Sequence, residues 1–184
     1  MSGSRFRLLA RAEQAPLLGL PWSLPLEEWP ERHFVEVERG IGRHVVRFVD
    51  LGGRLFALKE LPPRLAAREY RLLTALEREE APSVEAIGVV DGRRAEDGEA
   101  LSAVLVTRYL EFALPYRLIL GRSVLPAPEP SIRAALAELL VRLHLAGFFW
   151  GDCSLSNALF RRDAGELSAY LVDAETSELH DRLT

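Results

Sequence analysis

Two side-chain types occur once each in this chain, and both suit the chemistry of phosphate groups. Lys59 is the only lysine, against 22 arginines, and Asn157 is the only asparagine. The compact ammonium of a lysine is not interchangeable with a guanidinium where a point charge must fit against phosphate oxygens. A composition so rich in arginine has nevertheless kept Lys59. The two residues therefore point to phosphoryl transfer, which depends on positioning and on neutralising charge.

Two aspartates complete a polar group around Asn157. Asp152 precedes it with the D-x-x-x-x-N spacing of a kinase catalytic loop, and Asp173 ends the apolar run Leu171-Val172. Amide and carboxylate oxygens suit Mg²⁺, so Asn157 and Asp173 are the candidate metal ligands. Asp152 is the candidate base, or the group that orients an acceptor hydroxyl. Each residue type also favours turns by itself, so the prediction rests on their combined order.

The surroundings of Lys59 are consistent with a nucleotide site. Phe56-Ala57-Leu58-Lys59 is close to the V-A-I-K pattern of a third kinase strand, and the small Ala57 would leave room for an adenine ring. We expect Glu69, on the next helix, to form an ion pair with Lys59. Glu77 is the alternative partner.

A Gly-x-Gly pair lies between the first two predicted strands. Gly40 and Gly42 could cover phosphates through backbone N–H groups, but Val45 stands where G-x-G-x-x-G has its third glycine. A plain hairpin turn is therefore an equally simple interpretation of these glycines.

The elements that must position these residues follow from hydrophobic periodicity and turn signals. The first half reads as β-β-β-α-β-β, and the second as helices followed by two short strands. The predicted strands are 33–38, 45–51, 55–61, 84–90, 103–107, 158–160 and 169–172, and the predicted helices are 64–79, 110–120 and 132–145. Four prolines and two tryptophans before residue 33 predict an irregular, packed-down extension.

Composition excludes several classes of protein. The net charge of −4 and the isoelectric point of about 5.7 argue against a general nucleic-acid binder. The single cysteine, Cys153, allows no intramolecular disulfide, which fits a reducing compartment. The apolar piece Ala15–Leu20 is interrupted by Pro16 and too short for a signal peptide or a membrane span. We expect a cytoplasmic protein.

Together these motifs resemble the protein-kinase-like superfamily. The stretch from Leu143 to Asp152 (Leu-His-x-x-Gly-x-x-Trp-Gly-Asp) is most similar to its atypical branch of lipopolysaccharide-kinase-like, aminoglycoside-phosphotransferase-like and RIO-like enzymes. Pro21–Pro25 and Gly147–Arg162 also resemble a bacterial domain family of unknown function.

The resemblance implies an α+β, protein-kinase-like fold, with a five-stranded antiparallel N-lobe sheet, one helix and the first part of a helical C-lobe. The expected parts are an extension (1–32), an N-lobe (33–107), and a hinge with the start of the C-lobe (108–184). The hinge residues expected to meet adenine are Thr107, Arg108, Tyr109 and Leu110.

The chain also departs from that pattern. Trp150-Gly151 replaces the His-Arg before the catalytic aspartate, so control by activation-loop phosphorylation is not expected. Asp173-Ala174-Glu175 replaces Asp-Phe-Gly, which favours a non-classical substrate. The chain ends at Thr184, eleven residues after Asp173. We therefore expect a truncated C-lobe whose exposed apolar surface promotes self-association.

The function predicted on these grounds is an ATP- and Mg²⁺-dependent phosphotransferase with a hydroxyl acceptor, such as a small molecule, a lipid-linked glycan or a protein. Two alternatives remain open: a nucleotide-binding pseudokinase that acts as a regulatory or scaffold module, and a plain interaction domain that binds no nucleotide. His144 is interpreted as a structural helix end. Cys153 is interpreted as a packed small residue, with no reason for a low pKa.

Overall fold

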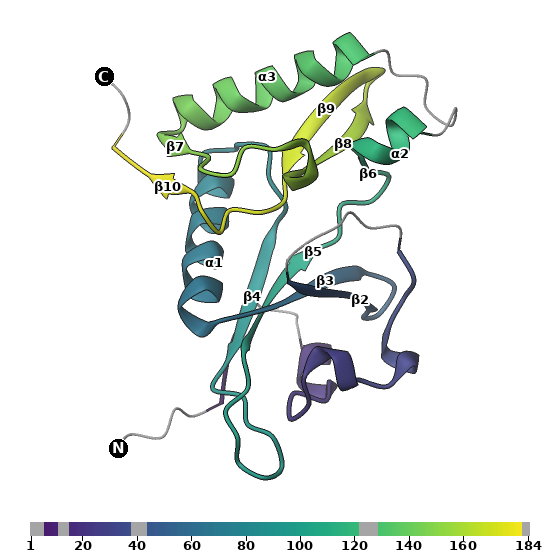
Figure 1. The fold of residues 1–184 in the computed structure, drawn as a ribbon, viewed down its shortest axis with the longest axis vertical. Helices are drawn as coiled ribbons and strands as arrows, with labels where there is room; N and C mark the ends of the chain where they lie inside the picture. The colour runs from purple at the N-terminus through teal and green to yellow at the C-terminus, as the bar shows by residue number, and fades with distance from the viewer. Residues whose placement is uncertain (1–5, 11–14, 38–43, 122–128, 182–184) are drawn as a thin grey trace. The chain divides into compact units, whose positions relative to one another are not determined.

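The computed structural model describes residues 6–10, 15–37, 44–121 and 129–181, which form two compact units (Figure 1). The first unit contains the described residues up to Tyr70, together with residues 86–109. The second contains residues 71–85 and the described residues from Leu110 onward. Each unit carries part of the candidate site, so each is described by itself.

A five-stranded antiparallel sheet forms the first unit. Its strand order is β1-β4-β5-β3-β2. The strands are β1 (Arg7–Ala10), β2 (Val45–Asp50), β3 (Leu55–Leu61), β4 (Ala86–Asp91) and β5 (Ala103–Arg108). Gly52 and Gly53 both have positive φ in the β2–β3 turn, where Asp50 Oδ1 accepts the N–H of Gly53 at 2.7 Å. The predicted α+β class and five-stranded antiparallel sheet are confirmed.

One of the five strands is not the one predicted. The range 33–38 was expected to be a strand, but a 3-10 helix (Glu31–His33) ends there and residues 34–37 have no regular structure. Residue 38 lies outside the described residues. The fifth strand is β1, which pairs with β4 in the register Leu9↔Val89. Gly88 permits this close pairing, since a Cβ atom there would lie 2.3 Å from the carbonyl oxygen of Leu9.

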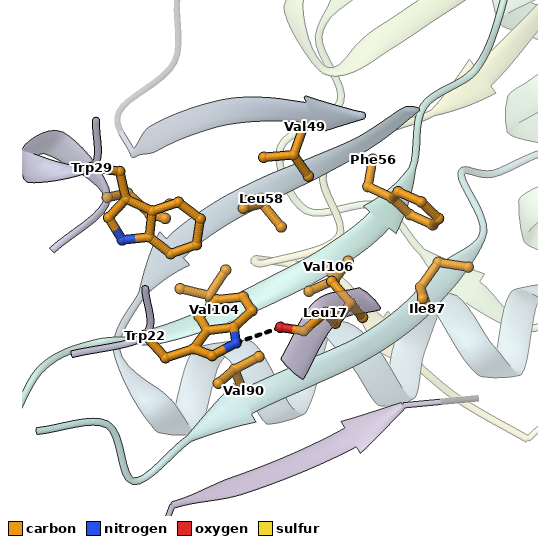
Figure 2. Close-up of a cluster of buried hydrophobic side chains, with 11 residues drawn as sticks. Leu17, Trp22, Trp29, Val49, Phe56, Leu58, Ile87, Val90, Val104 and Val106 are labelled. Carbon is orange, nitrogen blue, oxygen red and sulfur yellow. Dashed lines mark hydrogen bonds between the residues drawn. The ribbon is translucent and has the colours of Figure 1, made fainter. Parts of the chain in front are cut away.

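The extension covers one face of this sheet (Figure 2). The covering part begins after β1 and contains short 3-10 helices at Ala15–Gly19, Leu26–Glu28 and Glu31–His33. Trp22 and Trp29 are 6% and 3% exposed, and each indole N–H donates to a backbone carbonyl, of Leu17 and Leu24 respectively. Buried aromatic rings with satisfied N–H groups contribute a large apolar area. The cluster comprises Leu17, Trp22, Leu26, Trp29, Val49, Phe56, Leu58, Ile87, Val90, Val104 and Val106.

A buried arginine fastens the extension to the sheet. Arg93 is 1% exposed, and its Nε donates to the carbonyl oxygen of Trp22 at 3.0 Å. Its Nη1 donates to Glu60 Oε1 at 2.6 Å and to Ser102 O at 2.9 Å, and its Nη2 donates to Leu24 O. A buried guanidinium persists only when it is paired and hydrogen-bonded, so this network compensates its desolvation.

The helix α1 (Pro63–Arg78) follows β3 directly. Pro63 is its first residue, a position that tolerates proline because the first helical N–H has no intrahelical partner. Its buried residues recur at helical spacing and include one charged side chain; they are Ala66, Glu69, Leu72, Leu73 and Leu76. The predicted helix 64–79 is confirmed to within one residue at each end.

The second unit contains two helices and two small sheets. The helices are α2 (Tyr116–Gly121) and α3 (Glu129–Leu145). One sheet has the order β6-β8-β9, from β6 (Leu114–Pro115), β8 (Ala158–Asp163) and β9 (Glu166–Leu171); the other pairs β10 (Glu178–Leu179) with β7 (Phe148–Phe149). A 3-10 helix, η4 (Leu155–Asn157), leads into β8.

The helix α3 packs against β9 through one face (Figure 1). Its buried residues are Ile132, Ala135, Leu139 and Leu143. Gly147 ends the helical region with φ of 75° and donates its N–H to the carbonyl oxygen of His144 at 2.9 Å. Among the described residues, no helix is both long and apolar enough to cross a membrane.

Candidate active site

Lys59 lies on β3 and is paired with a buried carboxylate. Its Nζ lies 2.9 Å from Glu69 Oε2 and 3.2 Å from Oε1. The two side chains are 13% and 0% exposed. Glu77, the alternative partner, is instead an exposed residue near the end of α1. The ion pair therefore forms with Glu69, as the sequence predicted first.

This ion pair fixes both groups. An ionised carboxylate without solvent exposure is costly unless a cation and hydrogen bonds compensate it, and Lys59 supplies two such hydrogen bonds. Because successive residues of a strand point to opposite faces, Lys59 projects from the face opposite to Leu58 and Glu60. The extension covers that other face through Leu58, while Ala57 and Lys59 on the opposite face are half-buried.

Of the predicted adenine-contact residues, Ala57 and Thr107 lie on the same face of the sheet as Lys59, whereas Arg108 pairs with Phe56 on the opposite face. Ala57 is paired with Thr107 across β3 and β5, so the two side chains share a face with each other and with Lys59. Tyr109 donates its N–H to the carbonyl oxygen of Leu55 at 3.0 Å, and the Arg108 guanidinium lies 5.7 Å from the centre of the Phe56 ring.

Three other predicted cofactor-binding residues cannot be placed in this group. Leu110 belongs to the second unit. Gly40 and Gly42 lie outside the described residues, so the proposed phosphate-covering loop stays a prediction.

In the second unit, the β8–β9 hairpin brings Asn157 and Asp173 to one end. Its ladder runs from Asp163↔Glu166 at the turn to Ala158↔Leu171 at the open end. Beyond it, the N–H of Val172 donates to the carbonyl oxygen of Asn157 at 3.1 Å. Asp173 follows immediately. Asn157 lies just before β8 and Asp173 just after β9, so the two predicted metal ligands lie at the same end of the hairpin.

Local hydrogen bonds orient two of the three candidate site side chains of this unit, Asn157 and Asp173. Asn157 Nδ2 donates to the carbonyl oxygen of Asp152 at 3.1 Å, which leaves the amide oxygen Oδ1 as the group that can accept or ligate. Asp173 Oδ1 accepts the N–H of Glu175 at 2.9 Å, which fixes the direction of that carboxylate. The Asp152 side chain is exposed.

These donors fit Mg²⁺ better than a softer metal. They are one amide oxygen and one carboxylate, both hard ligands. The described part of the chain holds no cluster of three or more His, Cys, Asp or Glu side chains that could bind a metal. An ion bound to Asn157 and Asp173 would therefore complete its shell with water and phosphate oxygens, as Mg²⁺ does in phosphoryl transfer.

Cys153 has no activated thiol. Its side chain is exposed at the surface of the loop, yet partial burial of the thiol raises the pKa, and the neighbouring Asp152 carboxylate raises it further. A raised pKa keeps the sulfur protonated and weakly nucleophilic at neutral pH. The expectation that Cys153 has no low pKa agrees with this environment, but the interpretation as a packed residue was wrong, because the side chain is exposed.

The sequence did not predict the ion pair between Arg93 and Glu60, the residue that follows Lys59 on β3. Glu60 is held by Arg93 at 2.6 Å, while Glu60 Oε2 accepts the N–H of Leu26 at 3.3 Å. Arg93 lies in a polar loop segment whose composition resembles a solvated turn. No local pattern marks it as buried, because its partners come from distant parts of the chain.

Comparison with known proteins identifies the family. A profile of the lipopolysaccharide kinase (Kdo/WaaP) family matches residues 54–184, a span that includes Lys59, Asp152, Asn157 and Asp173. No curated protein sequence matches the chain significantly.

Among solved structures, the chain is similar to one described as WaaP in complex with acyl carrier protein. The identity is 19% and the TM-score 0.59, over 97% of this chain and 75% of that chain. At this identity the likeness shows the fold, which is protein-kinase-like. The matched profile spans most of the chain, and the chain therefore belongs to the lipopolysaccharide kinase (Kdo/WaaP) family, which indicates a kinase-like phosphotransferase.

Proposed function

We propose that this chain transfers the terminal phosphoryl group of ATP to a sugar hydroxyl of a lipopolysaccharide-type glycan, with Mg²⁺ as cofactor. The observation that carries the proposal is the buried ion pair between Lys59 and Glu69. A single lysine on a β-strand, oriented by a fully buried carboxylate, is the arrangement that a kinase uses to hold nucleotide phosphates. The family profile supports the glycan acceptor.

Each side chain then has a stated role. Lys59 contacts phosphate oxygens, and Glu69 holds its ammonium in place. Asp173 and Asn157 Oδ1 hold the metal ion, which when bound neutralises the charge that develops on the phosphates. Asp152 orients the acceptor hydroxyl and accepts its proton as the hydroxyl oxygen bonds to phosphorus. ADP leaves with the electron pair of the broken P–O bond.

Nucleotide and metal binding can be tested by the thermal midpoint of the chain with ATP, with and without Mg²⁺. A ligand at about 100 times its Kd stabilises the folded state by roughly 2.7 kcal/mol. We expect an Mg²⁺-dependent rise in wild type that is lost in Asp173→Asn. Asp97→Asn is a matched control, because Asp97 Oδ1 also accepts the N–H two residues ahead, from Glu99. This control should keep the full rise.

Transfer itself is tested separately, with Asp152→Ala and a phosphate-accepting glycan. The variant should keep the Mg²⁺-dependent rise in midpoint and lose phosphorylation of the acceptor. Nucleotide binding by wild type without any turnover would instead favour the pseudokinase alternative. That alternative draws on Val45, which replaces the third glycine of the phosphate loop. No rise in wild type would contradict both functions and favour an interaction domain.

A further inference from the structure

The residue before Asp152 is in contact with a distant part of the second unit. A Cβ atom placed on Gly151 would lie 2.3 Å from the carbonyl oxygen of Thr176 and 3.2 Å from its carbonyl carbon. These atoms belong to the backbone, so they cannot move aside as the end of a flexible side chain could. The glycine is needed here for close approach, since its φ is not in the left-handed region.

The segment that contains Thr176 is anchored on both sides of this contact. Ala174 and Ser177 are fully buried, and Ser177 donates its N–H to the carbonyl oxygen of Ala174 at 3.1 Å. Beyond this turn, β10 pairs with β7 in the register Leu179↔Phe148 (Figure 1). His180 then donates its N–H to the carbonyl oxygen of Gly147 at 2.8 Å.

These contacts connect two candidate site residues through very short pieces of backbone. Asp152 follows Gly151 directly, and Asp173 precedes the buried Ala174 directly. The turn 174–177 therefore transmits the position of the Gly151 backbone to the Asp173 carboxylate. A side chain at position 151 would push Thr176 away, and Asp173 would move with the turn.

We propose that Gly151 is a positioning residue, which sets Asp173 for metal binding by letting the turn 174–177 rest directly on the Asp152 loop. The proposal rests on the proposed function, because it concerns the same metal site.

The test compares Gly151→Ala with Gly19→Ala, a glycine whose added Cβ would meet no atom within 4 Å. The readout is the Mg²⁺ concentration that gives half of the ATP-dependent rise in thermal midpoint. Gly151→Ala should need at least about tenfold more Mg²⁺, the range seen when residues behind a metal ligand are changed. Gly19→Ala should match wild type. An unchanged Mg²⁺ requirement in folded Gly151→Ala would overturn the proposal.

A second pair of variants disturbs the turn from its other end. His180→Pro removes the N–H that binds Gly147, whereas His180→Ala keeps it. His180→Pro should raise the Mg²⁺ requirement and His180→Ala should not. If Gly151→Ala does not fold, the comparison of His180→Pro with His180→Ala tests the proposal instead. Equal Mg²⁺ requirements in these two variants would overturn it.

Failure of the proposed function gives a different result. If wild type shows no Mg²⁺–ATP response, the proposed function fails, and with it the metal-binding role of Gly151. If wild type responds and both Gly151→Ala and His180→Pro respond equally well, only the positioning role of Gly151 is lost. Amide hydrogen exchange at His180, whose N–H binds the carbonyl oxygen of Gly147, gives a reading without nucleotide: it should accelerate in Gly151→Ala and stay unchanged in Gly19→Ala.

Discussion

The two units hold their candidate site residues by different physical means. In the first, charged side chains do so: Glu69 binds Lys59 on one face of β3, and Arg93 binds Glu60 on the other. In the second unit, backbone contacts hold the candidate site residues in place.

The N–H of Val172 binds the carbonyl oxygen of Asn157, and Gly151 meets Thr176 without an intervening side chain. The candidate site side chains of the second unit, Asp152, Asn157 and Asp173, are exposed or half-buried. Stability and site chemistry should thus be coupled in the first unit and separable in the second.

The largest expected loss of stability is in the first unit, where stability and site chemistry are coupled. Arg93→Met removes the cation that compensates Glu60 and leaves the carbonyl oxygens of Trp22, Leu24 and Ser102 without this donor. Removing one member of a buried pair costs about 3–5 kcal/mol. The free energy of unfolding, measured by urea denaturation, should fall by that amount.

Arg94→Met is the control for this prediction. Arg94 is the next residue, but its guanidinium is exposed and donates to the carbonyl oxygen of Gly98 at 2.9 Å. Its loss should cost less than about 0.5 kcal/mol. Equal losses in the two variants would show that the Arg93 network does not fasten the extension.

The second largest loss of stability is expected when the ion pair between Lys59 and Glu69 is broken. Lys59→Met leaves the carboxylate of Glu69 buried without its cation, and should cost roughly 3 kcal/mol because Lys59 is itself slightly exposed. The double variant Lys59→Met, Glu69→Leu should regain most of this loss, since apolar side chains of similar size replace buried pairs well.

Neither of these variants should show an ATP-dependent rise in thermal midpoint. A double variant as unstable as Lys59→Met alone would mean that Glu69 is stabilised by groups other than Lys59. A normal ATP response in either variant would remove Lys59 from the proposed site.

Contacts between residues that are close in the sequence could be predicted, whereas contacts between distant residues could not. The β2–β3 hairpin and the Lys59–Glu69 pair were predictable because alternation, a Gly-Gly turn and a helix lie within one short stretch. The pairing of β1 with β4 was not, since Arg7 and Asp91 are 84 residues apart and four residues carry little periodicity. The network of Arg93 and Glu60, 33 residues apart, left no local signal either.

The wrong strand over 33–38 shows how a local pattern can mislead. Its alternation is genuine, and Val35 donates its N–H to the carbonyl oxygen of Phe48 at 2.9 Å, next to β2. Trp29 and Phe34 stack with ring centres 6.0 Å apart, and the intervening 3-10 helix takes up the start of the range. Tertiary packing of the aromatic residues therefore prevailed over strand propensity.

A smaller effect on stability is expected in the second unit, where site chemistry and stability are separable. Asp152→Ala removes an exposed carboxylate in the second unit, and the hydrogen bond from Asn157 survives because it reaches the backbone oxygen of Asp152. The free energy of unfolding should change by less than about 0.5 kcal/mol. Urea denaturation checks this, with loss of phosphorylation measured on the same sample. A loss of several kcal/mol would show that the Asp152 carboxylate, like Glu69, is part of the fold.

The smallest effect concerns the thiol beside Asp152. Burial, and then the negative charge of Asp152, raise the pKa of Cys153 above its ordinary value of 9.0. Because only the thiolate reacts, the rate of alkylation by iodoacetamide should stay low near neutral pH and keep rising with pH beyond 9.0. Asp152→Asn removes the charge but not the burial, so the pKa should fall partway and the rate near about pH 8 should increase by a few-fold.

Mass spectrometry of the modified thiol, measured between about pH 7 and 10, gives both profiles. Slower alkylation in Asp152→Asn would contradict the assigned effect of the Asp152 charge. An unchanged profile would assign the whole shift to burial.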